Sequence, residues 1–441
     1  MVSIVDDDDA AVRRSLGSLL MAAGRAKDLW RLRGEKRHAL ALAGGGVIGG
    51  MYEVGAVAAL EDRLNGDARF HVYVGCSAGS VVASLLANGV RASEILRIID
   101  ENLDDPLNFR RGAVYASDSF FQAASRFGQL VWAVGKNAIR GWRGSVPDML
   151  VRAEPDMPAG FFSLGALERF MREAFATRGL SNAFATLERM LLIPAVDLER
   201  AQRVVFGKDE LRDVPISQAI AASSAIPGFF EPYAIDGQDY VDGGVGFSGH
   251  ADLAAEEGAS VVVIVNPLVP SYEKCVTPLR NRGLYAIMEQ AGRIFSQNLL
   301  HLGLATLRVK YPRTEFFLIQ PSQADAPLFG PSMGFEASRA ALRFGYASTC
   351  DWLAGQGAAL LRRLQTRLEA AAVKLARLRP CDPRAGGVSS SAQRRQREVK
   401  RGAVVRVRRG PEPPAMRLDD RAADRESHAH AAGLGAEERA E

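Results

Sequence analysis

Cysteine is scarce in this chain: there are four in 441 residues, and no two have the Cys-x-x-Cys spacing of a zinc or redox site. Scattered cysteines argue against a disulfide framework and fit a reducing compartment. The chain also lacks a run of about 18 uncharged apolar residues, so no membrane-spanning helix is predicted. Its first nine residues include four aspartates where a secretion signal has basic and then apolar residues. Export is therefore not expected, and a cytoplasmic location is.

A strong excess of either charge is also absent. The net charge is +4, and residues 381–441 hold 13 basic and 10 acidic side chains, which accounts for three of the four. The rest of the chain is close to neutral, which gives no reason to expect a nucleic-acid partner. Hydrophobic residues make up 47% of the sequence. That content is enough for a large core and excludes a collagen-like or fully disordered chain.

Residues 37–352 alternate short apolar runs with stretches of helical periodicity, and we interpret them as one domain. The first run precedes a helix in which Val57, Leu60 and Leu64 share one face. Such alternation is typical of an α/β fold, in which a parallel sheet is covered by helices. Strands are predicted at residues 39–43, 70–74, 190–194, 203–206, 260–265 and 316–319.

Three further segments flank this domain. Residues 1–36 form an extension whose first 24 residues resemble the opening of a response-regulator receiver domain, although the segment is too short for a complete receiver. Residues 353–379 predict an amphipathic helix with leucines on one side and basic residues on the others. Residues 380–441 contain no Phe, Trp or Tyr. They cannot bury enough apolar surface to offset the entropy of ordering, so we predict a disordered basic tail.

Residues 75–79 read Gly-Cys-Ser-Ala-Gly and lie between a predicted strand and a predicted helix. A sharp strand-to-helix turn has room only for small side chains around the serine, and it lifts the serine hydroxyl clear of the sheet. The helix that follows also directs its N-terminal amides toward that hydroxyl. The five-residue pattern alone is weak, but this context makes Ser77 a candidate nucleophile.

A second glycine-rich turn, Gly-Gly-Gly-Val-Ile-Gly at residues 44–49, also follows a predicted strand. Consecutive glycines expose backbone N–H groups, which can bind either a phosphate or the oxyanion of a reaction intermediate. The Gly-Lys-Ser/Thr of a Walker loop is absent. Asp67 precedes the next strand rather than ending it, which argues against a dinucleotide site. An oxyanion hole serving Ser77 is therefore the better interpretation.

A third motif, Tyr-Val-Asp-Gly-Gly at residues 240–244, follows the segment Ala-Ile-Pro-Gly-Phe-Phe-Glu-Pro at residues 225–232. In this order along residues 37–352, the three motifs and this segment resemble the patatin-like phospholipases, a family of lipid acyl hydrolases. The resemblance implies a three-layer α/β fold with a mainly parallel central sheet.

The resemblance also implies a Ser–Asp dyad that works without histidine. No His, Asp and Glu cluster has the spacing of metal ligands, so no metal is predicted, and no cofactor is expected. Ser77 would be the nucleophile and Asp242 the base that takes its proton. Backbone amides of Gly44, Gly45 and Gly46 would form the oxyanion hole. The substrate would be a phospholipid or lysophospholipid ester, cleaved by a phospholipase A-type reaction through an acyl-enzyme intermediate.

The chain departs from the family pattern in two places. Ile48 stands where the glycine loop usually carries Arg or Lys, and the usual Asn-x-Pro after Asp-Gly-Gly is replaced by a segment ending in His250. Two alternatives therefore stay open. One is a catalytically weak lipid-binding or regulatory protein with the same fold. The other is a Ser–Asp–His esterase of the α/β-hydrolase type, using His250 or His301.

The tail gives a first testable prediction, that it tethers the protein to the inner face of the membrane. Residues 394–409 carry eight basic side chains and one acid, and each basic residue near an anionic leaflet contributes about 1 kcal/mol at low salt. Deleting residues 381–441 should weaken sedimentation with anionic vesicles at low salt and change little at high salt. Equal low-salt binding by the two proteins would show that the tail is not an anchor.

Overall fold

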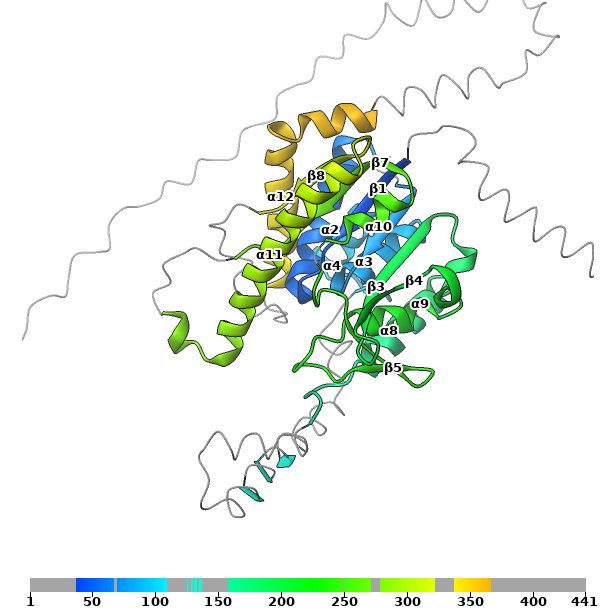
Figure 1. Cartoon of the computed structure of the whole chain (residues 1–441). Helices are drawn as coiled ribbons and strands as arrows, with labels where there is room; N and C mark the ends of the chain where they lie inside the picture. The colour runs from blue at the N-terminus through cyan, green and yellow to red at the C-terminus, as the bar shows by residue number, and fades with distance from the viewer. Residues whose placement is uncertain are drawn as a thin grey trace, which may run out of the picture. The chain divides into compact units, whose positions relative to one another are not determined.

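The computed structural model describes residues 37–66, 70–108, 158–247, 249–270, 278–321 and 337–365, with seven further positions between 125 and 136 (Figure 1). All of these lie within one unit, Met1–Ala376. The receiver-like extension at residues 1–36 and the basic tail at residues 380–441 lie outside the described residues, as do residues 366–379 of the expected amphipathic helix.

The centre of the fold is an eight-stranded sheet with the order β5-β6-β3-β2-β1-β7-β8, in which β4 also pairs with β3. Neighbouring strands from β3 to β8 in this order are parallel, whereas β4, β5 and β6 extend one side through antiparallel pairs. The α/β prediction with a mainly parallel sheet is confirmed. The strands are β1 Arg37–Leu42, β2 Val72–Gly75, β3 Met190–Asp197, β4 Gln202–Phe206, β5 Tyr233–Ile235, β6 Gln238–Asp242, β7 Ala259–Val265 and β8 Glu315–Ile319.

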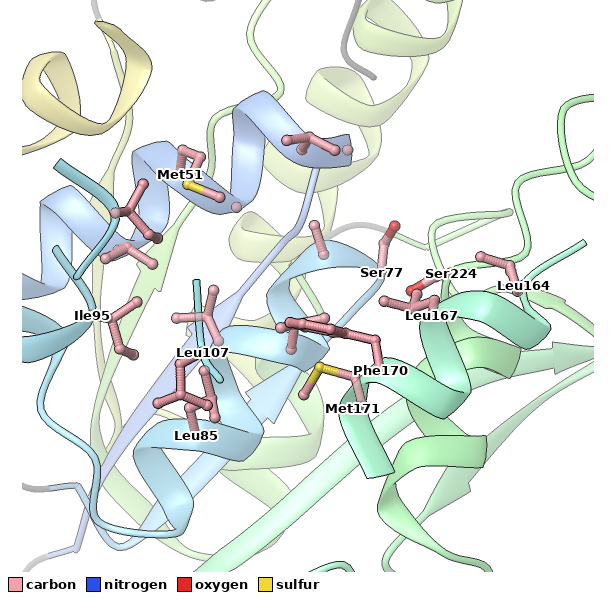
Figure 2. Close-up of a pocket in the computed structure, with 18 of the residues that line it drawn as sticks. Met51, Ser77, Leu85, Ile95, Leu107, Leu164, Leu167, Phe170, Met171 and Ser224 are labelled. Carbon is pink, nitrogen blue, oxygen red and sulfur yellow. The ribbon is translucent and has the colours of Figure 1, made fainter. Parts of the chain in front are cut away.

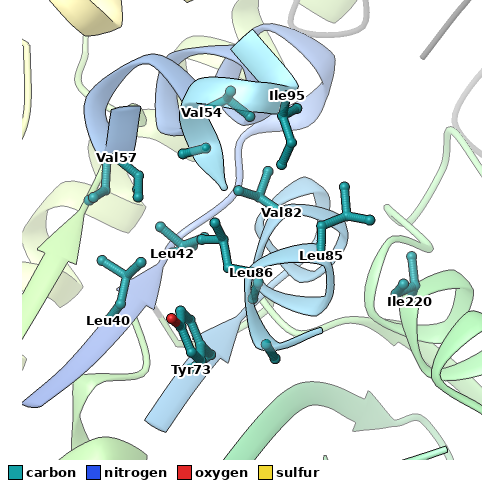
Figure 3. Packing of buried hydrophobic residues seen from close by; sticks show 14 of the residues in the cluster. Leu40, Leu42, Val54, Val57, Tyr73, Val82, Leu85, Leu86, Ile95 and Ile220 are labelled. Carbon is teal, nitrogen blue, oxygen red and sulfur yellow. The ribbon is translucent and has the colours of Figure 1, made fainter. Parts of the chain in front are cut away.

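The two faces of the sheet carry separate hydrophobic cores. Along β1, Leu40 and Leu42 belong to one core, and Ala39 and Ala41 belong to the other, as the two-residue period of a strand requires. The larger core packs beneath α2 Gly46–Arg63, α3 Ala78–Ala87, α4 Ala92–Asp100, α8 Gly165–Thr177, α9 Ile216–Ser223 and α12 Ser338–Ala354 (Figure 3). The smaller core packs beneath α10 Ala251–Glu256 and α11 Leu284–Lys310, which completes the three layers.

Helices α2 and α12 touch through their backbones. A Cβ atom at Gly55 of α2 would lie 2.1 Å from the carbonyl oxygen of Leu342, and one at Gly345 of α12 would lie 2.3 Å from the carbonyl oxygen of Tyr52. Neither distance leaves room for a methyl group, so glycine at these two positions sets how closely the helices pack.

The C-terminal end of the domain differs from the prediction. A boundary at residue 352 falls inside α12, and the helix expected from residue 353 is interrupted by a turn at 355–357. Two glycines stand in this turn, and a Cβ atom at Gly357 would lie 2.4 Å from the Trp352 ring, so the turn packs as it does only with glycine there. Helix resumes at residues 358–365, where Leu360 and Leu364 are buried in the larger core.

The contact between α2 and α12 gives the second prediction. Gly345→Ala should lower the free energy of unfolding by about 1–3 kcal/mol, because the added methyl group forces two backbones apart. The matched control is Gly292→Ala in α11, where a Cβ atom would meet nothing within 4 Å, so the protein should keep or slightly gain stability. Urea unfolding followed by circular dichroism measures both. Equal loss in the two variants would contradict the packing argument.

Candidate active site

The glycine loop lies between β1 and α2. Gly44, Gly45 and Gly46 have φ angles of 80°, 116° and 67°, which are strained for any residue with a side chain. A Cβ atom at Gly44 would lie 2.4 Å from the carbonyl oxygen of Cys76 and 2.9 Å from Cβ of Ser77. The backbone of this loop therefore rests directly against the turn that carries Ser77.

Ser77 occupies the turn between β2 and α3 with φ 53° and ψ −130°. Such a conformation costs free energy and persists only when the surroundings hold it. The Ser77 N–H donates to Oγ of Ser223 at 3.0 Å, and that hydroxyl donates to the Pro194 carbonyl at 2.6 Å. The Ser80 hydroxyl donates to the Ser77 carbonyl at 2.5 Å. The turn is thus held at both its amide and its carbonyl.

Asp242 ends strand β6, which the antiparallel pairing with β3 brings to the same edge of the sheet. Its Oδ1 accepts a hydrogen bond from the Gly244 N–H at 2.7 Å and lies 3.7 Å from Sγ of Cys76. Burial raises the pKa of this carboxyl, while hydrogen bonding from Ser77, Gly244 and Cys76 acts in the opposite direction. The structure therefore brings together the two side chains that the sequence motifs indicated.

Among the described residues that contact the Asp242 side chain, none is a histidine. His301 lies on α11, exposed, with its Nε2 3.0 Å from the amide nitrogen of Gln297. His250 lies behind the Asp242 turn, and its ring meets the backbone of Gly243. This arrangement favours a Ser–Asp pair over a Ser–Asp–His triad.

Glu53 is a buried residue of the site that the sequence did not indicate. Its side chain, in helix α2, is fully buried and accepts the Gly44 N–H on Oε1 at 2.7 Å. Within the described part of the chain, its Oε2 has no hydrogen-bond partner. Burial raises the pKa of this carboxyl well above its ordinary value. The Gly44 amide is thus already engaged. Gly45 caps α2 and Gly46 is its first residue, so their N–H groups have no acceptor within the helix itself.

Polar and aromatic side chains surround the buried His250. The Arg203 guanidinium lies 3.5 Å from Nδ1 of His250 and 2.6 Å from the Asp252 carboxylate. The same guanidinium stacks 4.5 Å above the Phe247 ring, which also faces the imidazole. These groups fill the place where the family pattern has Asn-x-Pro, directly behind the Asp242 turn.

An apolar pocket opens beside Ser77. Side chains of α2, α3, α4 and α8 supply most of its lining. Figure 2 shows Ser77 and Ser224 on one side of the pocket and Leu85 and Ile95 on the other. The Ser224 hydroxyl is buried and has no hydrogen-bond partner among the described residues. The lining suits an apolar group joined to a polar bond at Ser77.

Comparison with known proteins gives a family and several distant structures. The patatin-like phospholipase family matches residues 40–254, and no curated protein matches the chain. VipD from Legionella pneumophila is similar at 16% identity over 72% of this chain and 67% of its own, with a TM-score of 0.32. The type III effector ExoU is similar at 17% identity and a TM-score of 0.31, over 72% of this chain and 52% of ExoU. This chain thus spans about half the length of ExoU.

His250 gives the third prediction, on stability in acid. Burial, and then the Arg203 cation, lower the pKa of its ring from 6.5 to about 4. Between these values the unfolded chain binds more protons than the folded one, so the free energy of unfolding falls as pH is lowered. One such group contributes a slope of up to about 1.4 kcal/mol per pH unit. His250→Asn should flatten this slope in urea unfolding.

The matched control for this experiment is His301→Asn, which changes an exposed histidine of α11. It should keep the wild-type dependence of stability on pH. A purely structural role for His250 would lower stability equally at every pH, and that result would contradict the prediction.

Proposed function

Residues 40–254 belong to the patatin-like phospholipase family, and from this premise we propose that the chain hydrolyses lipid esters with a Ser77–Asp242 dyad. The family supports lipid hydrolysis. The observation that supports the dyad is the contact between a strained serine and a buried carboxyl at the mouth of an apolar pocket. The substrate class we propose is a phospholipid or lysophospholipid, cleaved at an acyl ester as in phospholipase A reactions.

In the first half of the reaction, Asp242 takes the proton of the Ser77 hydroxyl as Oγ attacks the ester carbonyl carbon. The carbonyl oxygen becomes an oxyanion, which the amides of Gly45 and Gly46 at the N-terminus of α2 stabilise. Collapse of this intermediate breaks the ester bond. The leaving alcohol receives the proton from Asp242, and the acyl group stays on Ser77.

In the second half, Asp242 takes a proton from water, which attacks the acyl-Ser77 carbonyl. The fatty acid leaves, and the proton returns to Oγ of Ser77. A carboxylate at its ordinary pKa is a weak base for a serine hydroxyl, and the burial that raises the pKa of Asp242 makes it a stronger one.

Gly44 has a different part in this proposal from the one the family resemblance implied. Because its N–H donates to Glu53, it holds the glycine loop against helix α2 instead of donating to the oxyanion. The neighbouring amides are then fixed in place before substrate binds, which is what electrostatic stabilisation of an intermediate requires.

The pocket indicates which part of the substrate is buried. Its lining is apolar apart from Ser77, Ser224 and backbone groups, which suits an acyl chain and excludes a charged headgroup from its depth. The headgroup would stay at the mouth, on the solvent side of Ser77. The unpartnered Ser224 hydroxyl is placed to donate a hydrogen bond to the bound ester.

The fourth prediction is that Ser77→Ala and Asp242→Asn each abolish acyl ester hydrolysis and leave the fold intact. Members of a dyad act as a unit, so the double variant should be little worse than either single one. Release of fatty acid from phospholipid and lysophospholipid measures turnover. A serine-directed fluorophosphonate should label the wild-type protein once, at Ser77.

Ser84→Ala is the matched control, because Ser84 lies on the same helix and its hydroxyl donates to the Val81 carbonyl within that helix. It should retain turnover and labelling. Turnover by Ser77→Ala, or labelling at another serine, would refute the dyad. An intact wild-type protein that binds lipid without hydrolysing it would support the lipid-binding alternative instead.

A further inference from the structure

Helix α11 exposes a line of large apolar side chains. Met288, Phe295, Leu302 and Val309 recur every seven residues and are 58%, 58%, 68% and 82% exposed. Seven residues make two helical turns, so these four side chains follow one line along the helix. Three further exposed side chains flank the line, namely Leu284, Ile287 and Ile294. We call these seven side chains the α11 apolar row.

The opposite face of α11 packs on the domain. Within residues 284–307 the charged side chains lie toward the domain, and the exposed apolar side chains face outward. Residues 284–307 contain only two charged side chains, Glu289 and Arg293. They pair with each other at 2.9 Å, and Arg293 is 5% exposed. A surface helix of a globular protein normally turns its charges outward. Here the outward face carries apolar groups and no formal charge for several turns.

Basic residues stand at both ends of this face. Arg280 and Arg282 precede the helix, and Arg308, Lys310 and Arg313 lie at or just beyond its end, all of them exposed. Glu289, already paired with Arg293, is the one acid between residues 278 and 313. An apolar row between two groups of cations complements a surface that is apolar inside and anionic outside, which is the chemistry of an acidic phospholipid bilayer.

The first turn of α11, where the apolar row begins, is also connected to the pocket. Tyr285, in the first turn of α11, lies 6.1 Å from the Phe229 ring, measured between centroids. Phe229 in turn lies 4.9 Å from Phe230, which lines the pocket beside Ser77. Aromatic contacts therefore connect the first turn of α11 with the lining of the pocket.

We propose that the α11 apolar row docks the protein on the surface of anionic phospholipid membranes. No described helix is long and apolar enough to cross a bilayer. In the docked state α11 would lie along the membrane surface, with its row in the headgroup and upper acyl region. A second copy of the chain is the rival occupant, because seven-residue spacing also suits helix pairing. Paired helices usually place complementary charges beside their seam, and residues 284–307 offer none there.

The test uses the full chain carrying Phe295→Gln and Leu302→Gln together. Sedimentation with vesicles of phosphatidylcholine and phosphatidylglycerol is measured at high salt, where charge contributions from the basic tail are screened. The double variant should partition at least tenfold more weakly than the wild-type protein. The matched control is Met190→Gln with Leu198→Gln, which alters two exposed apolar residues at the ends of β3 and should bind as the wild type does.

Two further measurements separate the possible outcomes. Turnover of a dispersed short-chain ester should be the same in the wild-type protein and the double variant, because the α11 apolar row does not line the pocket. The Ser77→Ala protein should bind vesicles as the wild type does, although it lacks turnover. Unchanged vesicle binding by the double variant would overturn the proposal. A wild-type dimer in analytical ultracentrifugation that the double variant converts to monomer would also overturn it, in favour of a second copy.

Discussion

Everything at the site depends on the contact between two backbone turns that leave no space for a side chain. A Cβ atom at Gly44 would lie 2.4 Å from the carbonyl oxygen of Cys76, in the turn of Ser77. A Cβ atom at Gly79 would lie 2.7 Å from the carbonyl oxygen of Leu42, at the end of β1. Because β1 and β2 are parallel neighbours, α2 and α3 begin side by side. The N-termini of both helices therefore lie near Ser77, where their dipoles favour a negative charge.

A different part of the sheet places Asp242 beside Ser77. Strand β6 runs antiparallel to β3, and Asp242 pairs in register with Ala195. A Cβ atom at Gly243 would lie 2.4 Å from the Pro194 carbonyl, the same carbonyl that anchors Ser223 and, through it, the Ser77 amide. One backbone position thus fixes both the turn of Ser77 and Gly243, the residue after Asp242. The geometry of the pair is set by backbone packing more than by the two side chains themselves.

The sequence predicted the parts of this arrangement that small residues determine. Ser77, Asp242 and the glycine loop stand in motifs because crowded turns admit few residue types, and the apolar strands follow from burial on both faces. The strands β5 and β6 were not predicted, because β5 has only three residues and polar residues interrupt β6. Glu53 was missed because a glutamate in a helix is usually exposed, and the occupied Gly44 amide was missed with it. Helix α11 was missed because many of its apolar residues are exposed, so they do not form the pattern of a core-facing helix.

Glu53 and helix α11 both depart from the usual arrangement of a folded protein. Glu53 buries a carboxyl group, and α11 exposes apolar side chains to solvent. A buried carboxyl with an unpartnered oxygen costs free energy, and so does a row of apolar side chains in water. Natural sequences retain such costs chiefly at functional sites. At Glu53 the return, under the proposed function, would be a glycine loop fixed before substrate binds. At α11 the cost would disappear in the docked state, because lipid would cover the row, and the same contact would bring the mouth of the pocket to the membrane that holds its substrate.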